Sequence, residues 1–470
     1  MATSDSKPSK LLPPKKYAAL PIDFLIIGGG IAGLSSAIAL TRVGHRVTLI
    51  ERDATVDHET GGCRMTPNLS KILYHWGLEK DVRRIGVKST GIDLQLYETG
   101  ERLGTHMWDY EMLSETRGEF IFTRHADLRK LLYDVAVANG AKVRLGTEVT
   151  GVDTEERRVK LSTGEVLTGD VIVGADGVKG LCRPMVLEEG VDDAPNHRYN
   201  YYASIVPRSI IAQDSALGCY ITEEDELQKR LYCWFGHERC ALTHPVAEQD
   251  TDWALLAYGL PNVALKQKFR IQKLSKLSNQ PPVCVPVLEY PELEEWVHDS
   301  GRLIVLGDAA HPMTPGGIQA AAMALEDGAV LAKLFSHIRT SDQIPTLLYA
   351  YQDLRQPHVR RVQQKDLSDL YFQCTPPGEV QQGSDDFMRA QRDAGRSPLA
   401  PAGADEEELP EWTEIKDVFG YDAEDDADNW WVEWGLLRER ARGTDVKLGF
   451  VEPIAIRQGR MSVSEAATVS

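Results

Sequence analysis

The sequence predicts an α/β fold, in which a Rossmann-like domain is interleaved with a domain built on a mixed β-sheet. A C-terminal segment, partly helical and strongly acidic, is expected to follow. Three observations support this prediction. Glycine-rich turns follow apolar strands at three places along the chain. Residues 195–290 are rich in aromatic, strand-forming side chains, and beyond about residue 375 the composition changes to Pro, Gly, Gln and acidic residues.

Size and charge narrow the classes of function. The chain has 470 residues, too many for one small module, and its 42% hydrophobic content is enough to bury a core. Its net charge of −18 disfavours a nucleic-acid partner. Residues 401–433 carry thirteen acids against one base, Lys416, so the rest of the chain is only mildly acidic. We expect this tract to be a solvated, partly disordered tail.

The cysteines and the N-terminus indicate a cytoplasmic protein. Seven cysteines without a C-x-x-C pair favour neither a disulfide scaffold nor a zinc site, and no metal is expected. Residues 1–16 lack the apolar core of a secretory signal. The apolar run 24–40 is interrupted by four glycines and is shorter than the roughly 20 residues of a membrane span. We therefore expect no membrane span.

The expected elements follow in chain order. A strand at 22–27, a helix at 34–42 and a strand at 46–50 form a βαβ unit. Helices are expected at 66–79 and 124–139, short strands between 142 and 173, and a buried strand at 170–174. Residues 195–290 should be mostly strands, clearest at 231–235 and 253–258, with a helical piece at 263–277. A strand at 303–306 precedes an Ala-rich helix at 318–337, and a helix near Trp430 ends the pattern.

The first motif combines Gly28, Gly30 and Gly33 with Glu51, which follows eighteen residues after the last glycine. It follows a strand, opens a helix and precedes a second strand that ends in an acid. Glycines let the backbone approach a pyrophosphate, the helix N-terminus offers free N–H groups, and the acid can bond ribose hydroxyls. The motif therefore predicts dinucleotide binding, with FAD or NAD expected before NADP.

Two further motifs also follow strands. Gly174, Ala175, Asp176 and Gly177 make the first, whose alternative interpretation is a tight turn without a ligand. The second runs over residues 307–317 and begins Gly307-Asp308-Ala-Ala-His311. Small residues around an Asp let a cofactor chain lie against the backbone, and Pro315-Gly316-Gly317 aims the next helix at an electron-rich group.

The three motifs, in this order and spacing, resemble those of class A flavin-dependent aromatic hydroxylases, such as para-hydroxybenzoate and salicylate hydroxylases. The resemblance covers residues 22–375, and residues 66–70 with Trp76, Gly77 and Leu78 also resemble the salicylate branch. It implies bound FAD, transient NADPH or NADH, O2 as co-substrate, and a hydroperoxide formed at C4a of the flavin. The cofactor-binding residues that it implies are Gly28, Gly30, Ile31, Ala32, Gly33, Glu51, Arg52, Arg124, Asp176, Gly307, Asp308, His311, Pro315, Gly316, Gly317 and Ile318. For Arg124, a helix cap or salt bridge is the alternative.

The resemblance also implies a division into domains. We expect a flexible lead at 1–21, a discontinuous FAD-binding domain at 22–80, 119–185 and 300–375, and a substrate domain at 81–118 and 186–299. Residues 376–470 form the acidic C-terminal segment. Residues 314–320 depart from the family pattern, so the wall beside the flavin is expected to differ, and the resemblance does not fix the substrate.

The expected reaction is hydroxylation of a small phenolic or hydroxybenzoate-like substrate by a monomer or homodimer, with or without release of CO2. The alternative is epoxidation or hydroxylation of a larger intermediate of secondary metabolism, such as an indole or a prenylated phenol. A flavin-binding protein without turnover is disfavoured, because Asp176 and Asp308 are intact. A short-chain NAD dehydrogenase is also disfavoured, because its usual Tyr-x-x-x-Lys pair does not follow a matching helix and it would not need the Gly307-Asp308 segment.

Candidate catalytic residues lie in the strand-rich region. They are Tyr220, His237 and Arg239, with Tyr202 and His244 as further candidates for a base near a phenol. Arg239 is the candidate anchor for a substrate carboxylate. A structural role is the alternative for each of these residues.

Overall fold

The computed structural model describes residues 8–58, 61–187, 194–213, 229–246, 252–261, 282–399 and 417–437. Contacts divide the chain into two compact units, residues 1–427 and residues 428–470. The sheets and long helices described below belong to the first unit. Among the described residues, no helix combines the length and the apolar character needed to cross a membrane.

A five-stranded parallel sheet forms the first layer, in the order β18-β12-β1-β2-β8. Its strands are β1 (Asp23–Ile27), β2 (Arg46–Ile50), β8 (Lys142–Arg144), β12 (Val171–Gly174) and β18 (Leu303–Val305). The helix α1 (Ile31–Arg42) packs against α5 (His125–Ala138) and α8 (Ala320–Phe335). The apolar run Phe24–Ile27 is buried, as expected of a strand in a parallel sheet that is covered on both faces. The alternation of strand and helix along the chain provides this cover, because the helices that connect parallel strands pack on the faces of the sheet.

A seven-stranded mixed sheet forms the second layer, in the order β17-β13-β16-β15-β14-β5-β6. Its strands are β5 (Gly91–Leu96), β6 (Arg102–Met107), β13 (Asn196–Val206), β14 (Arg230–Gly236), β15 (Arg239–Pro245), β16 (Trp253–Gly259) and β17 (Val283–Glu289). Side chains alternate between its two faces. We call the face that carries Tyr201, Leu242 and Leu256 the inner face, and the face that carries Tyr97, Ala241 and Leu255 the outer face.

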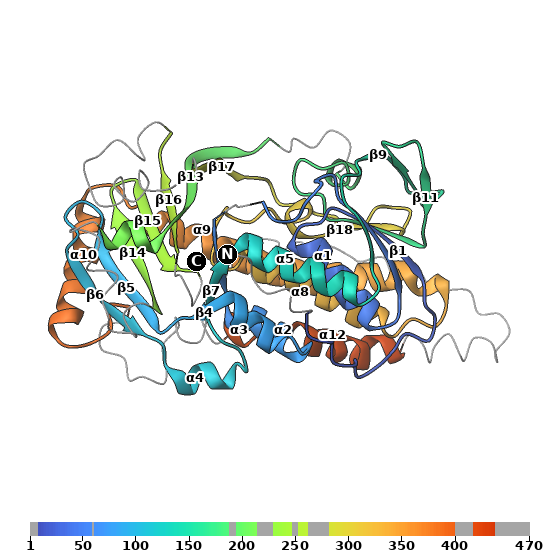
Figure 1. Cartoon of the computed structure of the whole chain (residues 1–470), viewed down its shortest axis with the longest axis horizontal. Coiled ribbons are helices and arrows are strands. Elements are labelled where there is room, and N and C mark those ends of the chain that lie inside the picture. Colours follow the sequence, from blue (N-terminus) through green and yellow to red (C-terminus); the bar gives the residue numbers. More distant parts are fainter. Residues whose placement is uncertain are drawn as a thin grey trace, which may run out of the picture. The chain divides into compact units, whose positions relative to one another are not determined.

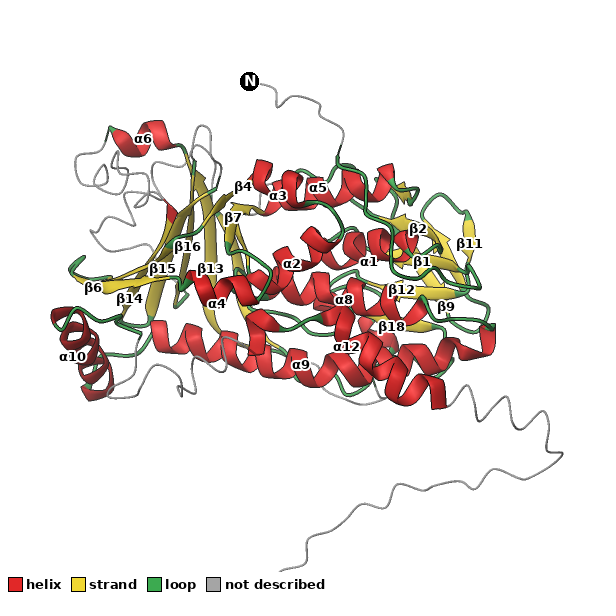
Figure 2. Ribbon diagram, turned by 90° about the horizontal axis from the view of Figure 1, so that it is seen from below, coloured by secondary structure: helices red, strands yellow, loops and turns green. Residues whose placement is uncertain are grey.

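Two small sheets and several helices complete the first unit (Figure 1). The small sheets are β3-β7-β4, made of β3 (Gly62–Met65), β4 (Gly86–Lys88) and β7 (Ile121–Arg124), and β9 (Val149–Asp153), β10 (Arg158–Leu161) and β11 (Val166–Thr168). The helices are α2 (Pro67–His75), α3 (Glu79–Ile85), α4 (Tyr110–Glu115), α6 (Arg208–Ala212), α9 (Ile344–Gln373), α10 (Glu379–Asp393) and α12 (Ala423–Trp430), whose last residues belong to the second unit. In Figure 2, α9 runs from the five-stranded sheet to the seven-stranded sheet.

The predicted α/β fold is confirmed, and so is the βαβ unit at its N-terminus. Three expectations need correction. Residues 66–79 form α2 and the start of α3 rather than one helix, because Gly77 takes φ +92° between them. The helix expected from 318 begins at Ala320. Residues 379–393, expected to pack poorly, form α10, which contacts β6 and buries Met388.

Part of the acidic tract is also packed. Lys71 donates to the carbonyl oxygens of Gly420 and Tyr421 at 2.9 and 2.7 Å. Residues 417–427 therefore form part of the first unit rather than a solvated tail. The helical piece expected at 263–277 lies outside the described residues.

Candidate active site

The three glycines of the first motif have different surroundings. Gly28 has φ +107°, and a Cβ there would lie 2.2 Å from the carbonyl oxygen of Ala175. A Cβ on Gly33 would lie 2.0 Å from the carbonyl oxygen of Gly28, whereas one on Gly30 would meet nothing within 4 Å. Gly28 and Gly33 thus permit tight backbone packing. Gly30, the N-cap of α1, leaves open space beside free helix N–H groups, as a bound phosphate requires.

Glu51 closes this turn from the end of β2. Its carboxylate accepts hydrogen bonds from the backbone N–H groups of Gly29 at 2.5 Å and Asp53 at 2.8 Å. Arg129, from α5, donates to the carbonyl oxygen of Gly29 at 2.8 Å and lies 3.4 Å from the Glu51 carboxylate. No sequence pattern singles out Arg129, because the position of an arginine on a helix does not show which loop its side chain reaches.

Asp176 of the second motif has one satisfied and one unsatisfied oxygen. Oδ2 accepts from the N–H groups of Leu181 at 2.7 Å and Cys182 at 3.1 Å. Oδ1 is buried and has no hydrogen-bond partner in the described part of the chain. Burial raises the pKa of this carboxyl. A buried acceptor without a partner is suited to a ligand that donates a hydrogen bond.

The third motif begins with a tight turn against α1. Gly307 has φ +59°, and a Cβ there would lie 2.6 Å from the Cβ of Ala32. Asp308 is exposed at the end of β18, and its Oδ1 accepts from the Met313 N–H at 3.2 Å. Surrounding protein raises the pKa of the Asp308 carboxyl by desolvation. The carboxylate is therefore held at the sheet edge with capacity for further hydrogen bonds.

A buried network of charges holds this turn in place. Asp327 accepts from the Gly307 N–H at 2.8 Å, from His311 Nε2 at 2.7 Å and from Arg355 Nε at 2.9 Å. Arg355 also donates to Glu326 at 2.7 Å, and the Arg355, Glu326 and Asp327 side chains are fully buried. His311, expected to bind the cofactor, is thus engaged through Nε2 in positioning the motif.

The Gly316 and Gly317 turn lies between this network and the seven-stranded sheet. Tyr258 donates its hydroxyl to the carbonyl oxygen of Pro315 at 2.6 Å, and Arg64 donates to that of Gly316. Gly316 has φ +67°, and a Cβ there would lie 2.5 Å from the Tyr201 ring. The turn therefore connects the third motif to the inner face of the sheet.

The inner face of the sheet closes over the Gly61 and Gly62 backbone. A Cβ on Gly61 would lie 2.7 Å from the Ala203 Cβ, and one on Gly62 would lie 2.7 Å from the His244 ring. His244 is fully buried, and burial lowers its pKa to about 3, so the ring is neutral at physiological pH. Its Nε2 has no hydrogen-bond partner among the residues described.

Of the other predicted catalytic residues, Arg239 and Tyr202 lie on the outer face. The Arg239 guanidinium stacks on the Tyr97 ring at 5.5 Å, and its Nε lies 3.8 Å from Glu98. Tyr202 packs against the outer-face cluster. Arg239 therefore lies on the face of the sheet opposite to Tyr201 and the Gly316 turn, because successive residues of β15 point to opposite faces, and its role as a substrate anchor stays a prediction.

His237 belongs to the hairpin turn beside Arg239, where its backbone N–H donates to Glu98 at 3.1 Å. Tyr220 lies outside the described residues. Arg124 forms an ion pair with Asp252, which agrees with its alternative role, and Arg52 is exposed. The cofactor roles of Arg124 and Arg52 stay predictions.

Sequence reasoning missed Arg64 and Asp366. Arg64 lies on β3, one residue after Cys63, and Asp366 lies on α9. Each is only 6% exposed, which is unusual for a charged residue. The available signal was weak: one arginine in a short apolar segment, and one acid in a highly charged helix.

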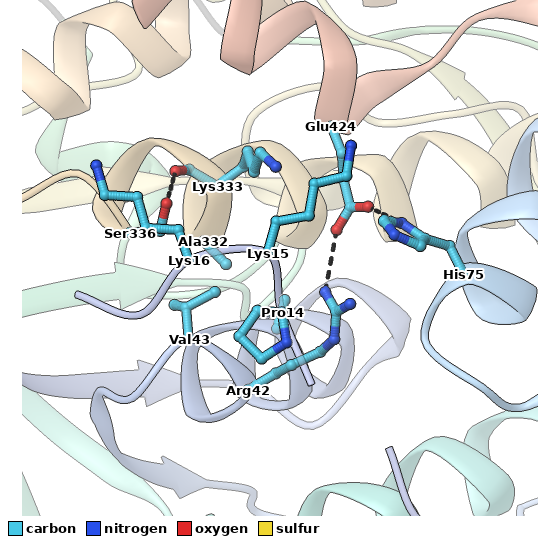
Figure 3. A pocket seen from close by; sticks show the side chains of 11 residues that line it. Pro14, Lys15, Lys16, Arg42, Val43, His75, Ala332, Lys333, Ser336 and Glu424 are labelled. Carbon is cyan, nitrogen blue, oxygen red and sulfur yellow. Dashed lines mark hydrogen bonds and ion pairs between the residues drawn. The ribbon is translucent and has the colours of Figure 1, made fainter. Parts of the chain in front are cut away.

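A small pocket lies away from the three glycine motifs, and several of the side chains that line it hold one another by hydrogen bonds and ion pairs (Figure 3). Residues 14–16 border it together with the ends of α1 and α8. Glu424 points toward Arg42 and His75 there; it lies 3.3 Å from Arg42, accepts from Trp76 at 3.2 Å and also bonds His75. None of the three glycine motifs lines this pocket.

Comparison with known proteins identifies the family. A model described as "FAD binding domain" matches residues 22–366. The chain belongs to this FAD-binding family. It is 28% identical over 424 residues to the FAD-dependent monooxygenase OpS4 of Beauveria bassiana (strain ARSEF 2860), covering 86% of this chain and 96% of that protein.

Other relatives carry more specific names. The chain is 25% identical over 350 residues to 6-hydroxynicotinate 3-monooxygenase of Bordetella bronchiseptica (strain ATCC BAA-588 / NCTC 13252 / RB50), covering 72% of this chain and 88% of that enzyme. It is 27% identical over 387 residues to hispidin-3-hydroxylase of Neonothopanus nambi, covering 74% and 89% of the two chains. The crystal structure of CtdE with FAD and substrate 4 shares the fold, with a TM-score of 0.71 at 19% identity, covering 89% of this chain and all of CtdE.

The protein is thus an FAD-dependent monooxygenase of the class A fold, and the predicted cofactor FAD is confirmed. The motif geometry fits this cofactor on independent grounds. Gly30 leaves open space at a helix N-terminus, Asp176 has a buried acceptor without a partner, and Asp308 presents a carboxylate at the sheet edge. Each feature matches a different part of a dinucleotide.

Proposed function

We propose that this monooxygenase uses NADH or NADPH and O2 to hydroxylate an aromatic substrate of the phenolic or hydroxybenzoate kind. The observation that supports this proposal is the composition of the inner face of the seven-stranded sheet. It brings Tyr201 and Tyr258 against the Gly316 turn, with Arg64 as a buried cation beside them. An aromatic wall that contains one positive group suits an aromatic ring with one acidic or anionic substituent.

The chain holds FAD through the three motifs. The N-terminus of α1 at Gly30 binds the diphosphate, Glu51 and Asp176 lie at the ends of neighbouring strands, and Asp308 bonds the ribityl chain. Bound FAD supplies the redox chemistry, because it accepts a hydride from the nicotinamide and activates O2 once it is reduced.

Residues outside the motifs position the reacting groups. The hydroxyl of Tyr258 holds the Pro315 carbonyl, and the Asp327 network holds Gly307, so the two ends of the third motif are fixed independently. Tight packing of Ala203 and His244 on Gly61 and Gly62 leaves little room for water there. Exclusion of water favours transfer of oxygen to the substrate over release of peroxide.

The outer-face position of Arg239 favours a second candidate. Arg239, the expected carboxylate anchor, lies on the face of the sheet opposite to the Gly316 turn, and this supports an uncharged and larger intermediate, such as an indole or a prenylated phenol. A substrate of this kind would place the enzyme in secondary metabolism.

A substrate screen tests both candidates. Consumption of NADH and of NADPH by the FAD-loaded enzyme is measured with phenols, hydroxybenzoates and indoles, and peroxide is measured in parallel. We expect one class to accelerate nicotinamide oxidation and to yield a product one oxygen atom heavier. Peroxide equal to the nicotinamide consumed, for every compound, would contradict the proposed hydroxylation.

A further inference from the structure

Two buried charged groups flank the turn of Gly316 and Gly317. Arg64 approaches from β3 and donates through Nη2 to the Gly316 carbonyl oxygen. Asp366 approaches from α9, and a Cβ on Gly317 would lie 2.4 Å from its Oδ2. Burial raises the pKa of Asp366 and the Arg64 charge opposes this rise, and buried opposite charges are usually paired. Here neither group has an ion-pair partner within 4 Å among the described residues.

Arg64 has unused hydrogen-bonding capacity. A guanidinium carries five N–H donors, and within the described part of the chain Arg64 makes one hydrogen bond. Its positive charge nevertheless acts on several inner-face groups. Burial raises the pKa values of the Tyr201 and Tyr258 hydroxyls and lowers that of His244, and the Arg64 charge shifts all three pKa values downward. Arg64 therefore faces the wall that is expected to contact the substrate.

Asp366 is suited to exchange a proton. Its carboxylate accepts one long hydrogen bond, from the Gln319 N–H at 3.4 Å. Burial raises its pKa to about 7, Asp369 on the same helix adds to this effect, and Arg64 opposes it. From the sheet, Tyr258 is the titratable side chain that responds to Asp366. A carboxyl that changes protonation near neutral pH matches the requirement for a general base.

We propose that Arg64 and Asp366 together bind an ionisable oxygen of the substrate, a phenol or enol hydroxyl, beside the Gly316 and Gly317 turn. Asp366 accepts the hydroxyl proton, the electron pair of the O–H bond stays on the oxygen, and Arg64 donates hydrogen bonds to the resulting oxyanion. The negative oxygen makes the carbons ortho and para to it more electron-rich, which favours their attack on an electrophilic oxygen. This inference rests on the proposed hydroxylase function and specifies its substrate class.

The test measures ionisation of a bound probe in the FAD-loaded protein without turnover. The probe is 3-nitrophenol, which is mostly neutral in water at about pH 7.5 and whose phenolate absorbs at longer wavelength. Its methyl ether, 3-nitroanisole, is the control ligand that cannot ionise. We expect bound 3-nitrophenol to show the phenolate band and to bind at least about tenfold more tightly than the ether, a difference of about 1.4 kcal/mol.

Variants separate the two roles. Arg64→Met should abolish the phenolate band, whereas Arg239→Met, which removes a buried guanidinium on the outer face, should leave it unchanged. When 3-nitrophenol binds to Asp366→Asn, its phenol proton should be released to the solvent, and a pH indicator detects this release. When it binds to the wild type, Asp366 should retain the proton. FAD content and melting temperature verify that each variant is folded, and Arg64→Gln, which also lacks the positive charge, replaces Arg64→Met if the latter loses FAD.

Three results would overturn the inference: no phenolate band or no binding of 3-nitrophenol to the wild type, a band that survives in the Arg64 variant that retains FAD, or equal proton release by the wild type and Asp366→Asn. A change of the FAD spectrum in the Arg64 variants without probe would instead place Arg64 at the flavin. Since no turnover is involved, these outcomes are independent of whether the substrate screen detects hydroxylation.

Discussion

Two alanine substitutions, two and five residues after Gly28, should separate FAD binding from stability: Gly30→Ala should mainly weaken FAD binding, and Gly33→Ala should mainly lower stability. Gly30 has φ −74° and ψ −176°, which alanine adopts without strain, and its added Cβ would meet no protein atom within 4 Å. Gly30→Ala should therefore cost about 1 kcal/mol of stability or less, the difference expected between glycine and alanine at an N-cap. Its methyl group would occupy the space that a phosphate needs, so FAD affinity should fall at least about tenfold.

Gly33→Ala is the matched variant. Its Cβ would lie 2.0 Å from the carbonyl oxygen of Gly28, a backbone atom that cannot rotate away. Relief of this overlap requires α1 to move from β1, and overpacking of this kind costs about 1–3 kcal/mol or more. Gly33→Ala should therefore lower the melting temperature of the FAD-free protein, and any loss of FAD should follow from that loss of stability.

The assays are thermal unfolding of the FAD-free protein and titration with FAD, followed by flavin fluorescence. If Gly30→Ala binds FAD as tightly as the wild type does, the phosphate does not approach this turn and the assignment of the site is wrong. If the melting temperature of FAD-free Gly33→Ala equals that of the wild type, α1 can move away from the turn without loss of stability, and the predicted cost of the overlap is wrong.

Three further predictions concern the charged residues. Asp308→Ala should weaken FAD retention during gel filtration and change the melting temperature little, since Asp308 is exposed and makes one hydrogen bond; full FAD occupancy would exclude its ribityl role. Arg355→Met should destabilise the protein by about 3–5 kcal/mol in denaturant titration, because it leaves Glu326 and Asp327 buried without their cation, and an unchanged midpoint would contradict this. Asp366→Asn should stabilise the protein by up to about 4 kcal/mol above pH 7 and have little effect below pH 4. The sign follows because the pKa of Asp366 is 3.8 unfolded and about 7 folded, so the wild type loses stability as pH rises between these values; a pH-independent difference would refute it.

Local motifs were predictable because their requirements lie within a few residues of one another. Gly28, Gly30 and Gly33 are close in sequence and serve one turn, in which Gly30 leaves space for a ligand, whereas Gly28 and Gly33 permit close backbone packing. The ends of β1, β12 and β18 were predictable for the same reason, since an apolar strand followed by glycine is a local pattern. The sequence by itself therefore determined the fold class, the βαβ unit and the residues expected to contact FAD.

The face that each strand presents to the site was decided only by tertiary structure. Arg239 and Cys240 are neighbours in sequence, but Cys240 packs in the inner-face cluster and Arg239 stacks on Tyr97 at the outer face. A shift of one residue in strand pairing would exchange these faces, and pairing depends on strands that are distant in sequence. For the same reason, no local pattern shows that Arg64 and Asp366, about three hundred residues apart, lie on either side of one turn.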